Sequence, residues 1–265
     1  INYKNYGGFS SLTAILNISD YERYYGFPIR PVFVKKSNEI TVVDTTYKDT
    51  ASTHEYVDLG LPSGTLWATH NVGATKPEEY GNYFAWGETK PKKNDIFHWG
   101  TYKWAKSFYD VDRSNCGDFA WLLSSIKKYK LGRLSCWGIS STDNLTTLQP
   151  EDDAATVNLG KDWRIPTKEE IEELIKNCKY SWTEINGVNG AKFEAPNGNS
   201  IFLPAAGTQE SFVYNEGNVG YYWTSSFDGD TAAYVLYFYF HSEEATSRKT
   251  VRFIGIPIRP VRSKK

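Results

Sequence analysis

The feature that most constrains the fold is the last third of the chain, where three strand-like runs follow one another. They span residues 220–227, 232–242 and 250–261, and Gly, Asp, Ser or Pro residues bound each of them. β-Branched and aromatic residues favour strands, so this pattern predicts three consecutive strands at the end of the domain. In the middle run, strand alternation places Leu236, Phe238 and Phe240 on one face and Val235, Tyr237, Tyr239 and His241 on the other. We expect one face to be core and the other to meet solvent or a partner.

The composition indicates a folded protein and limits its partners. A net charge of -1 over 265 residues gives no attraction to nucleic acid or anionic lipid. No apolar run approaches the ~20 residues needed to cross a bilayer, so we expect no membrane insertion. The aromatic content of 16% has two interpretations, a β-rich core packed with rings or a binding surface built from Tyr and Trp.

The N-terminal part carries an internal match. Residues 26–32 (GFPIRPV) closely match residues 255–261 (GIPIRPV). We therefore interpret 1–36 as the closing part of a preceding copy of the domain, expected to pack on the main domain or a neighbouring chain. Residues 37–54 form a predicted linker with a short strand at Ile40–Val43, and the main domain is expected to span 55–265.

The order of elements within the main domain can be predicted in outline. Residues 55–74 indicate two short strands joined by a turn, and 75–149 are irregular apart from a possible helix at 119–129. A short helix is expected from Pro150, where the acidic residues favour the positive end, to Gly160. Asn-Gly pairs at 186–187, 189–190 and 197–198 are typical of hairpin turns.

The clearest helix begins at Thr167. Thr167 and Glu170 form a capping box, and Ile171, Leu174, Ile175 and Cys178 follow with helical spacing. This apolar stripe is expected to pack under the sheet of the closing strands, which makes Cys178 a small core residue. The neighbouring carboxylates Glu169, Glu170, Glu172 and Glu173 are expected to form a solvated face.

Several spans, taken in order, resemble the Fibrobacter succinogenes major paralogous domain, over roughly residues 55–261. The spans are DLGLPSGTLWATHNVGA, NYFAWGE, DAATVNLGKDWRIPTKEE, GNSIFLPAAG, YYWTSS and GIPIRPV. That domain is common in secreted and surface proteins of Bacteroidetes-type bacteria. The wider resemblance is to the C-type-lectin-like group, which also holds formylglycine-generating enzymes and the variable proteins of diversity-generating retroelements.

The resemblance implies an α+β fold of the C-type-lectin-like kind. Two helices pack on small twisted antiparallel sheets, the loops are long and irregular, and the first and last strands pair. Within the motifs, Trp67, Trp86, Trp163 and Trp223 are expected in the core. Arg164, Arg259 and the matching Arg30 are expected to hold loops in place.

The sequence supports neither catalysis nor a cofactor. A formylglycine-generating enzyme needs cysteines near its C-terminal end, and none follows Cys178. The four histidines lie in no nucleophile-elbow setting. The tripeptides with which C-type lectins hold calcium are missing, and no Cys/His spacing suits zinc, so we expect no bound metal. The three cysteines allow one disulfide at most, with Cys116 and Cys136 the nearest pair.

Binding is therefore the leading hypothesis. The candidate ligand-binding residues lie around the closing strands and are Tyr221, Tyr222, Asp228, Asp230, Tyr237, Tyr239, His241 and Arg248. Ordinary sheet residues are the alternative interpretation of this set. We expect a non-enzymatic extracellular or outer-membrane-surface domain that binds a glycan or a host or bacterial surface protein. A structural spacer repeat is the alternative, and an enzyme of the formylglycine-generating type comes third.

Overall fold

The computed structural model describes residues 46–48, 54–92, 96–105, 126–130, 134–135, 138–139, 143, 145–227, 229 and 232–264. These residues all belong to one compact unit that spans 44–265. Three of the sequence predictions are wholly outside the part of the chain that the structure describes: the partial copy at 1–36, the strand at Ile40–Val43, and the pairing of Cys116 with Cys136.

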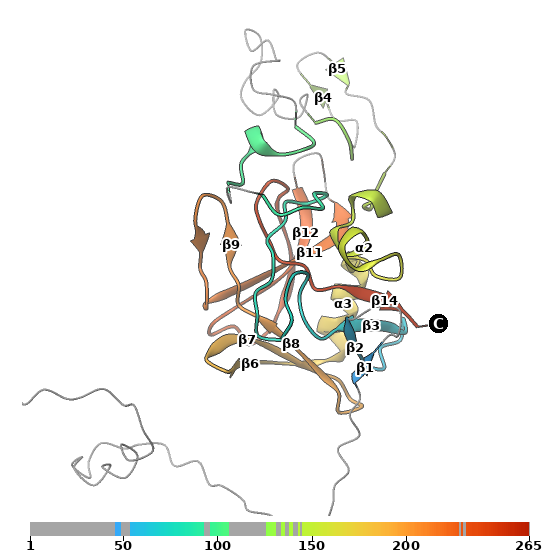
Figure 1. The fold of residues 1–265 in the computed structure, drawn as a ribbon, viewed down its shortest axis with the longest axis vertical. Helices are drawn as coiled ribbons and strands as arrows, with labels where there is room; N and C mark the ends of the chain where they lie inside the picture. The colour runs from blue at the N-terminus through green and yellow to red at the C-terminus, as the bar shows by residue number, and fades with distance from the viewer. Residues whose placement is uncertain are drawn as a thin grey trace, which may run out of the picture. The chain divides into compact units, whose positions relative to one another are not determined.

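The described residues form an α+β fold with small antiparallel sheets (Figure 1). The first sheet has the order β1-β2-β3-β14, with strands β1 Thr46–Lys48, β2 Glu55–Asp58, β3 Thr65–Ala68 and β14 Val261–Ser263. The β2–β3 pair confirms the predicted opening hairpin. Val261 in β14 lies opposite Trp67 in β3, so the C-terminal strand closes onto that hairpin.

Two three-stranded sheets make up the rest of the main framework. One contains β6 Lys179–Ile185, β7 Val188–Glu194 and β8 Ser200–Pro204, and the other contains β11 Val219–Phe227, β12 Ala232–Tyr239 and β13 Thr246–Val251. Shorter elements are β4 Leu134–Ser135, β5 Gly138–Ile139, β9 Thr208–Gln209, β10 Val213–Tyr214, and the 3-10 turns η2 Trp99–Thr101 and η3 Pro150–Asp152. The α-helices are α2 Ala154–Leu159 and α3 Lys168–Asn177.

The capped helix α3 is confirmed, together with its packing. Thr167 caps the helix by accepting a hydrogen bond from the Glu170 amide at 3.3 Å, and Glu170 accepts one from the Thr167 amide at 2.9 Å. Ile171 and Leu174 are buried in the same core cluster as Leu236 of β12, while Ile175 is only half-buried. The apolar stripe therefore lies under the sheet β11-β12-β13, here called the closing sheet.

The prediction of a fully solvated acidic face on α3 is wrong. The Glu170 carboxylate forms two 2.6 Å contacts with the Arg164 guanidinium and accepts a hydrogen bond from the Thr65 hydroxyl at 2.6 Å. Glu173 accepts a hydrogen bond from the Ser63 amide at 2.8 Å. The helix thus docks its acidic side on the opening hairpin. This docking also confirms that Arg164 holds a loop in place.

The helix predicted from Pro150 is divided. Residues Pro150–Asp152 form the 3-10 turn η3, and the α-helix starts anew after Asp153, whose backbone is extended. The buried Asp153 carboxylate accepts hydrogen bonds from the amides of Thr156 at 2.9 Å and Ile165 at 2.8 Å. The acidic run therefore supplies a specific N-cap as well as charge at the positive helix end.

Two of the three Asn-Gly pairs form turns. Asn186 and Gly187 have φ values of 51° and 84° between β6 and β7, and Gly198 has a φ of 86° between β7 and β8. The prediction is wrong for Asn189-Gly190, which lies inside β7. A Cβ atom on Gly190 would lie 2.4 Å from the carbonyl oxygen of Leu203, so glycine there allows β8 to approach.

The last run of the sequence is not one strand. Strand β13 begins at Thr246 and ends at Val251, and residues 252–260 form only isolated bridges, such as Ile256 with Phe84. Pro257 and Pro260 lack the amide hydrogens that a continuous ladder requires. The fully buried Arg259 holds this segment in place by donating to the carbonyls of Ala68, Thr69 and Phe202 and to Asn71 Oδ1.

Both faces of the closing sheet are covered at its centre. Leu236 and Phe238 lie in one core cluster, while Trp223 and Val235 lie in another that includes Trp86 and Ile256. The four motif tryptophans are at most 1% exposed, as expected. The prediction that one whole face would be free is therefore wrong, because both faces are covered at the centre, while Tyr239 near the β12–β13 turn is exposed.

In the described part of the predicted irregular stretch, 75–149, the only helices and strands are the short elements η2, β4 and β5. Of the helix predicted at 119–129, only residues 126–129 are described, and they are not helical. Ile126 instead forms an isolated bridge with Ala105.

Candidate functional site

The candidate site lies on the open end of the closing sheet. The register places Tyr221 opposite Tyr237, Tyr237 opposite Thr246, and Val219 opposite Tyr239. Side chains at directly opposed positions share a face, which brings residues from all three strands together. The sheet therefore gathers polar and aromatic residues that are up to 25 or so positions apart in the chain.

Three of these residues form a row of rings, here called the tyrosine row: Tyr221, Tyr237 and Tyr239. The ring centroids of Tyr221 and Tyr237 are 5.0 Å apart, and those of Tyr237 and Tyr239 are 5.7 Å apart. Tyr221 and Tyr237 are half-buried, and burial raises the pKa of Tyr221. Tyr239 is 41% exposed, so it offers the most accessible ring of the row.

Arg248 covers the middle of the row. Its guanidinium carbon lies 3.9 Å from the centroid of the Tyr237 ring, which is a cation–π contact. Arg248 lies opposite Val235, two positions farther from the β12–β13 turn than the Tyr237–Thr246 pair. The positive charge is therefore placed on the inner part of the row, away from Tyr239.

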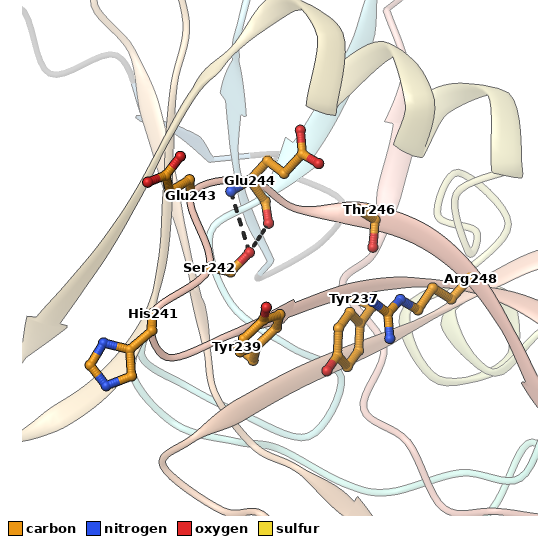
Figure 2. A pocket seen from close by; sticks show the side chains of 8 residues that line it. All are labelled: Tyr237, Tyr239, His241, Ser242, Glu243, Glu244, Thr246 and Arg248. Carbon is orange, nitrogen blue, oxygen red and sulfur yellow. Dashed lines mark hydrogen bonds between the residues drawn. The ribbon is translucent and has the colours of Figure 1, made fainter.

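A cavity of about 660 Å³ adjoins the row at the β12–β13 turn (Figure 2). We call it the turn cavity; it is lined by Tyr237, Tyr239, His241, Ser242, Glu243, Glu244, Thr246 and Arg248. The Thr246 hydroxyl is buried in its wall and has no hydrogen-bond partner among the described residues.

Local contacts hold the turn in shape. The Ser242 hydroxyl donates to the Glu244 carbonyl and accepts from the Glu244 amide at 3.3 Å. The Phe240 amide donates to the Asn218 carbonyl at 2.8 Å, and the Phe240 ring packs 5.7 Å from that of Trp182. His241 has a φ of 69°, which ends the strand alternation after Tyr239. Phe240, predicted with the core face, packs beside Trp182 on that face and, lying just past the end of β12, is 46% exposed.

The structure brings together five of the eight predicted site residues. They are Tyr221, Tyr237, Tyr239, His241 and Arg248, of which Tyr221 touches the row without lining the cavity.

The prediction for Tyr222 is wrong. It is 1% exposed, and its hydroxyl donates to the Pro204 carbonyl at 2.7 Å. Burial raises the pKa of Tyr222. Strand alternation explains the difference, because the neighbour of an outward Tyr221 must point into the core. Asp228 and Asp230 lie outside the described residues.

Sequence reasoning missed four residues of the turn cavity: Ser242, Glu243, Glu244 and Thr246. The polar run HSEEATS directly after the aromatic strand was the available signal. It marks a turn that places its side chains beside the last residues of β12.

A second group of titratable residues lies at the opening hairpin. The rings of His54 and His70 are 3.8 Å apart, and both residues are buried. Burial lowers the pKa of each histidine to about 4. The charge of Arg259 lowers both pKa values further, and His70 also lowers the pKa of His54. These histidines are therefore neutral at physiological pH, and their packing indicates a structural role.

Other chemistry finds little support. Burial raises the pKa of Cys178 to about 11, which makes it a poor nucleophile. Among the described residues, no group of three or more His, Cys, Asp and Glu side chains is placed to hold a metal ion. In the same part of the chain, none of the helices has the length and apolar character to cross a bilayer.

Comparison of the chain with protein-family models, curated proteins and solved structures gave no match.

Proposed function

We propose that this chain is a non-enzymatic binding or adhesion domain that recognises a glycan or a protein through the tyrosine row and the turn cavity. The observation that carries the proposal is the exposed Tyr239 ring at the mouth of a polar cavity. Tyr rings supply rigid contact area at a low cost in conformational entropy, and their hydroxyls add hydrogen bonds. Both properties suit the recognition of sugar rings and of protein side chains.

We further propose a C-type-lectin-like arrangement for the fold. Three features support it: the C-terminal strand β14 pairs with the opening hairpin, α3 packs under the closing sheet, and the described residues 69–92 form neither a helix nor a strand. The same resemblance is the basis for proposing an extracellular or cell-surface location. A fold of this kind does not by itself specify a ligand, so the binding proposal depends on the site.

A binding role fits the chemistry of the site better than catalysis does. The turn cavity contains carboxylates, hydroxyls, one imidazole and one guanidinium, and the guanidinium is already stacked on Tyr237. A hydrolytic or acyl-transfer mechanism needs a nucleophile hydrogen-bonded to a base. Ser242 instead exchanges its hydrogen bonds with the backbone of Glu244.

The test is a paired ligand screen. The wild-type protein and the Tyr239→Ala variant would be applied to a glycan array and to a panel of bacterial and host surface proteins. Specific binding by the wild type that falls at least about fivefold in the variant is expected, because a stacked ring contributes on the order of 1 kcal/mol or more. Tyr214→Ala, which removes another exposed tyrosine, is the matched control.

Two results would contradict the proposal. One is the absence of any specific ligand, and the other is binding that is the same in the wild type and in Tyr239→Ala. Equal melting temperatures for the three proteins would show that the variants are folded.

A further inference from the structure

The rings of the tyrosine row are not equally available to a ligand. Arg248 lies 3.9 Å from the Tyr237 ring centroid, and Tyr221 packs against the same ring at 5.0 Å. Tyr239 contacts Tyr237 at a centroid distance of 5.7 Å and keeps 41% of its surface exposed. An incoming group that stacks in the turn cavity therefore meets Tyr239 first.

The turn that lines the cavity carries two unpaired negative charges. Glu243 and Glu244 are exposed and line the cavity, and neither carboxylate forms an ion pair or hydrogen bond within the described part of the chain. The hydrogen bonds of Glu244 involve only its backbone. Figure 2 shows both residues on the β12–β13 turn, whereas Arg248 extends from the strand beyond it.

The tyrosine row itself shows which kind of group such a surface accepts. The Arg248 guanidinium packs on Tyr237 because the face of an aromatic ring attracts cations. Tyr239 offers a ring of the same kind without a cation of its own, and Glu243 and Glu244 line the same cavity. A cation placed there would gain both the ring and the carboxylates, whereas an anion would be repelled.

We infer that the turn cavity binds an ammonium or guanidinium group that projects from a basic segment of a partner protein. This inference rests on the proposed binding function and narrows it to one class of ligand. The cavity, at about 660 Å³, has room for several residues of a peptide rather than for one side chain alone.

A protein source is favoured by the surroundings of the cavity. The exposed ring of Tyr239 lines the cavity and would cover the aliphatic stem of a Lys or Arg side chain. Tyr and Arg are also the residue types enriched at the centres of protein interfaces. An amino sugar could present the same ammonium group, so it forms a separate arm of the test.

The experiment measures fluorescence anisotropy with a labelled peptide, Gly-Arg-Lys-Arg-Lys-Gly. The peptide is titrated with the wild-type protein, with Tyr239→Ala and with the double variant Glu243→Gln/Glu244→Gln. The matched charge control is Glu184→Gln/Glu216→Gln, which removes two exposed carboxylates elsewhere. A peptide with Gln at each basic position and a glucosamine trisaccharide complete the set of ligands.

We expect the basic peptide to bind the wild type and the charge control equally. Its affinity should fall about five- to thirtyfold in the Glu243/Glu244 double variant and by a similar factor in Tyr239→Ala. Affinity should also weaken with added salt, because the carboxylates are exposed. The Gln peptide should not bind.

The outcomes separate this inference from the proposed function. Tyr239-dependent binding of neutral glycans without binding of the basic peptide would overturn the inference and leave the proposed function standing. Binding of the glucosamine trisaccharide alone would overturn the protein source. Equal loss of peptide affinity in the charge control would show attraction to overall charge only and would also overturn it. If no ligand bound in either screen, both the inference and the proposed function would be refuted.

Discussion

Acidification from pH 7.5 to pH 5 should destabilise the protein through the His54–His70 pair. The two rings are 3.8 Å apart, and the His54 Nε2 atom lies 3.2 Å from the His70 carbonyl oxygen. The Trp163 ring packs on His54 at 5.3 Å, the fully buried Arg259 adds a positive charge nearby, and the carboxylates of Glu55 and Glu79 offset it only in part. Protonation would place two more positive charges in this site.

The sign and size of the effect follow from proton linkage. The pKa of each histidine is about 4 in the folded protein, against the ordinary value of 6.5 that applies to the unfolded chain. The unfolded chain thus binds more protons as the pH falls through 6.5, and stability is lost between pH 6.5 and pH 4. At pH 5 the loss of unfolding free energy is at most about 2 kcal/mol for each histidine. We therefore expect a loss of about 2–4 kcal/mol for the pair.

Urea unfolding followed by tryptophan fluorescence at pH 7.5, 6 and 5 measures this loss directly. The wild type should lose about 2–4 kcal/mol of unfolding free energy over this range. A double variant, His54→Gln/His70→Gln, removes the titration and should show a much flatter dependence, whatever its absolute stability. His241→Asn is the control, because it removes an exposed histidine from a position with positive φ that asparagine tolerates.

Two results would refute the reasoning. A wild-type unfolding free energy that stays constant from pH 7.5 to pH 5 would show that the histidines titrate normally in the folded protein. A double variant that keeps the full wild-type slope would place the responsible groups elsewhere.

Three further predictions concern stability and metal binding. Leu174→Ala should lower the unfolding free energy by about 2–5 kcal/mol, because Leu174 is 0% exposed; a loss below about 1 kcal/mol in urea titration would contradict the packing of α3. Arg259→Met should cost more than about 3 kcal/mol, since three carbonyls and Asn71 lose their donor, and an unchanged melting temperature would disprove that role. Millimolar calcium or a chelator should leave the melting temperature unchanged, because the lectin calcium tripeptides are missing; a clear rise with calcium would reveal a site.

Local signals in the sequence were sufficient for several elements. The capping box at Thr167 and the apolar spacing behind it predicted α3 and its buried face, because both depend on residues within a few positions of each other. The Asn186-Gly187 turn was predictable for the same reason, since few residues adopt its positive φ values. The α+β class followed from counting such elements.

The candidate site was predictable only in part. Aromatic alternation along β12 identified Tyr237 and Tyr239, and adjacency in sequence suggested Tyr221. The same reasoning wrongly included Tyr222, because the direction in which β11 faces the core depends on what packs against it. Glu243 and Glu244 join the site through the turn after Tyr239, and no periodic pattern marks that turn.

The sequence by itself determined the local features of this protein. These are the residues at which helices and turns begin and end, and the positions of the apolar residues. Tertiary structure alone decided which faces are buried. The closing sheet lies between two core clusters, so Val235 and Trp223 are as deeply buried as Leu236 on the opposite face. Asn189-Gly190 lies in a strand because β8 packs within reach of Gly190. Burial depends on contacts between segments far apart in the chain, and these contacts are energetically stronger than the local preferences that a sequence displays.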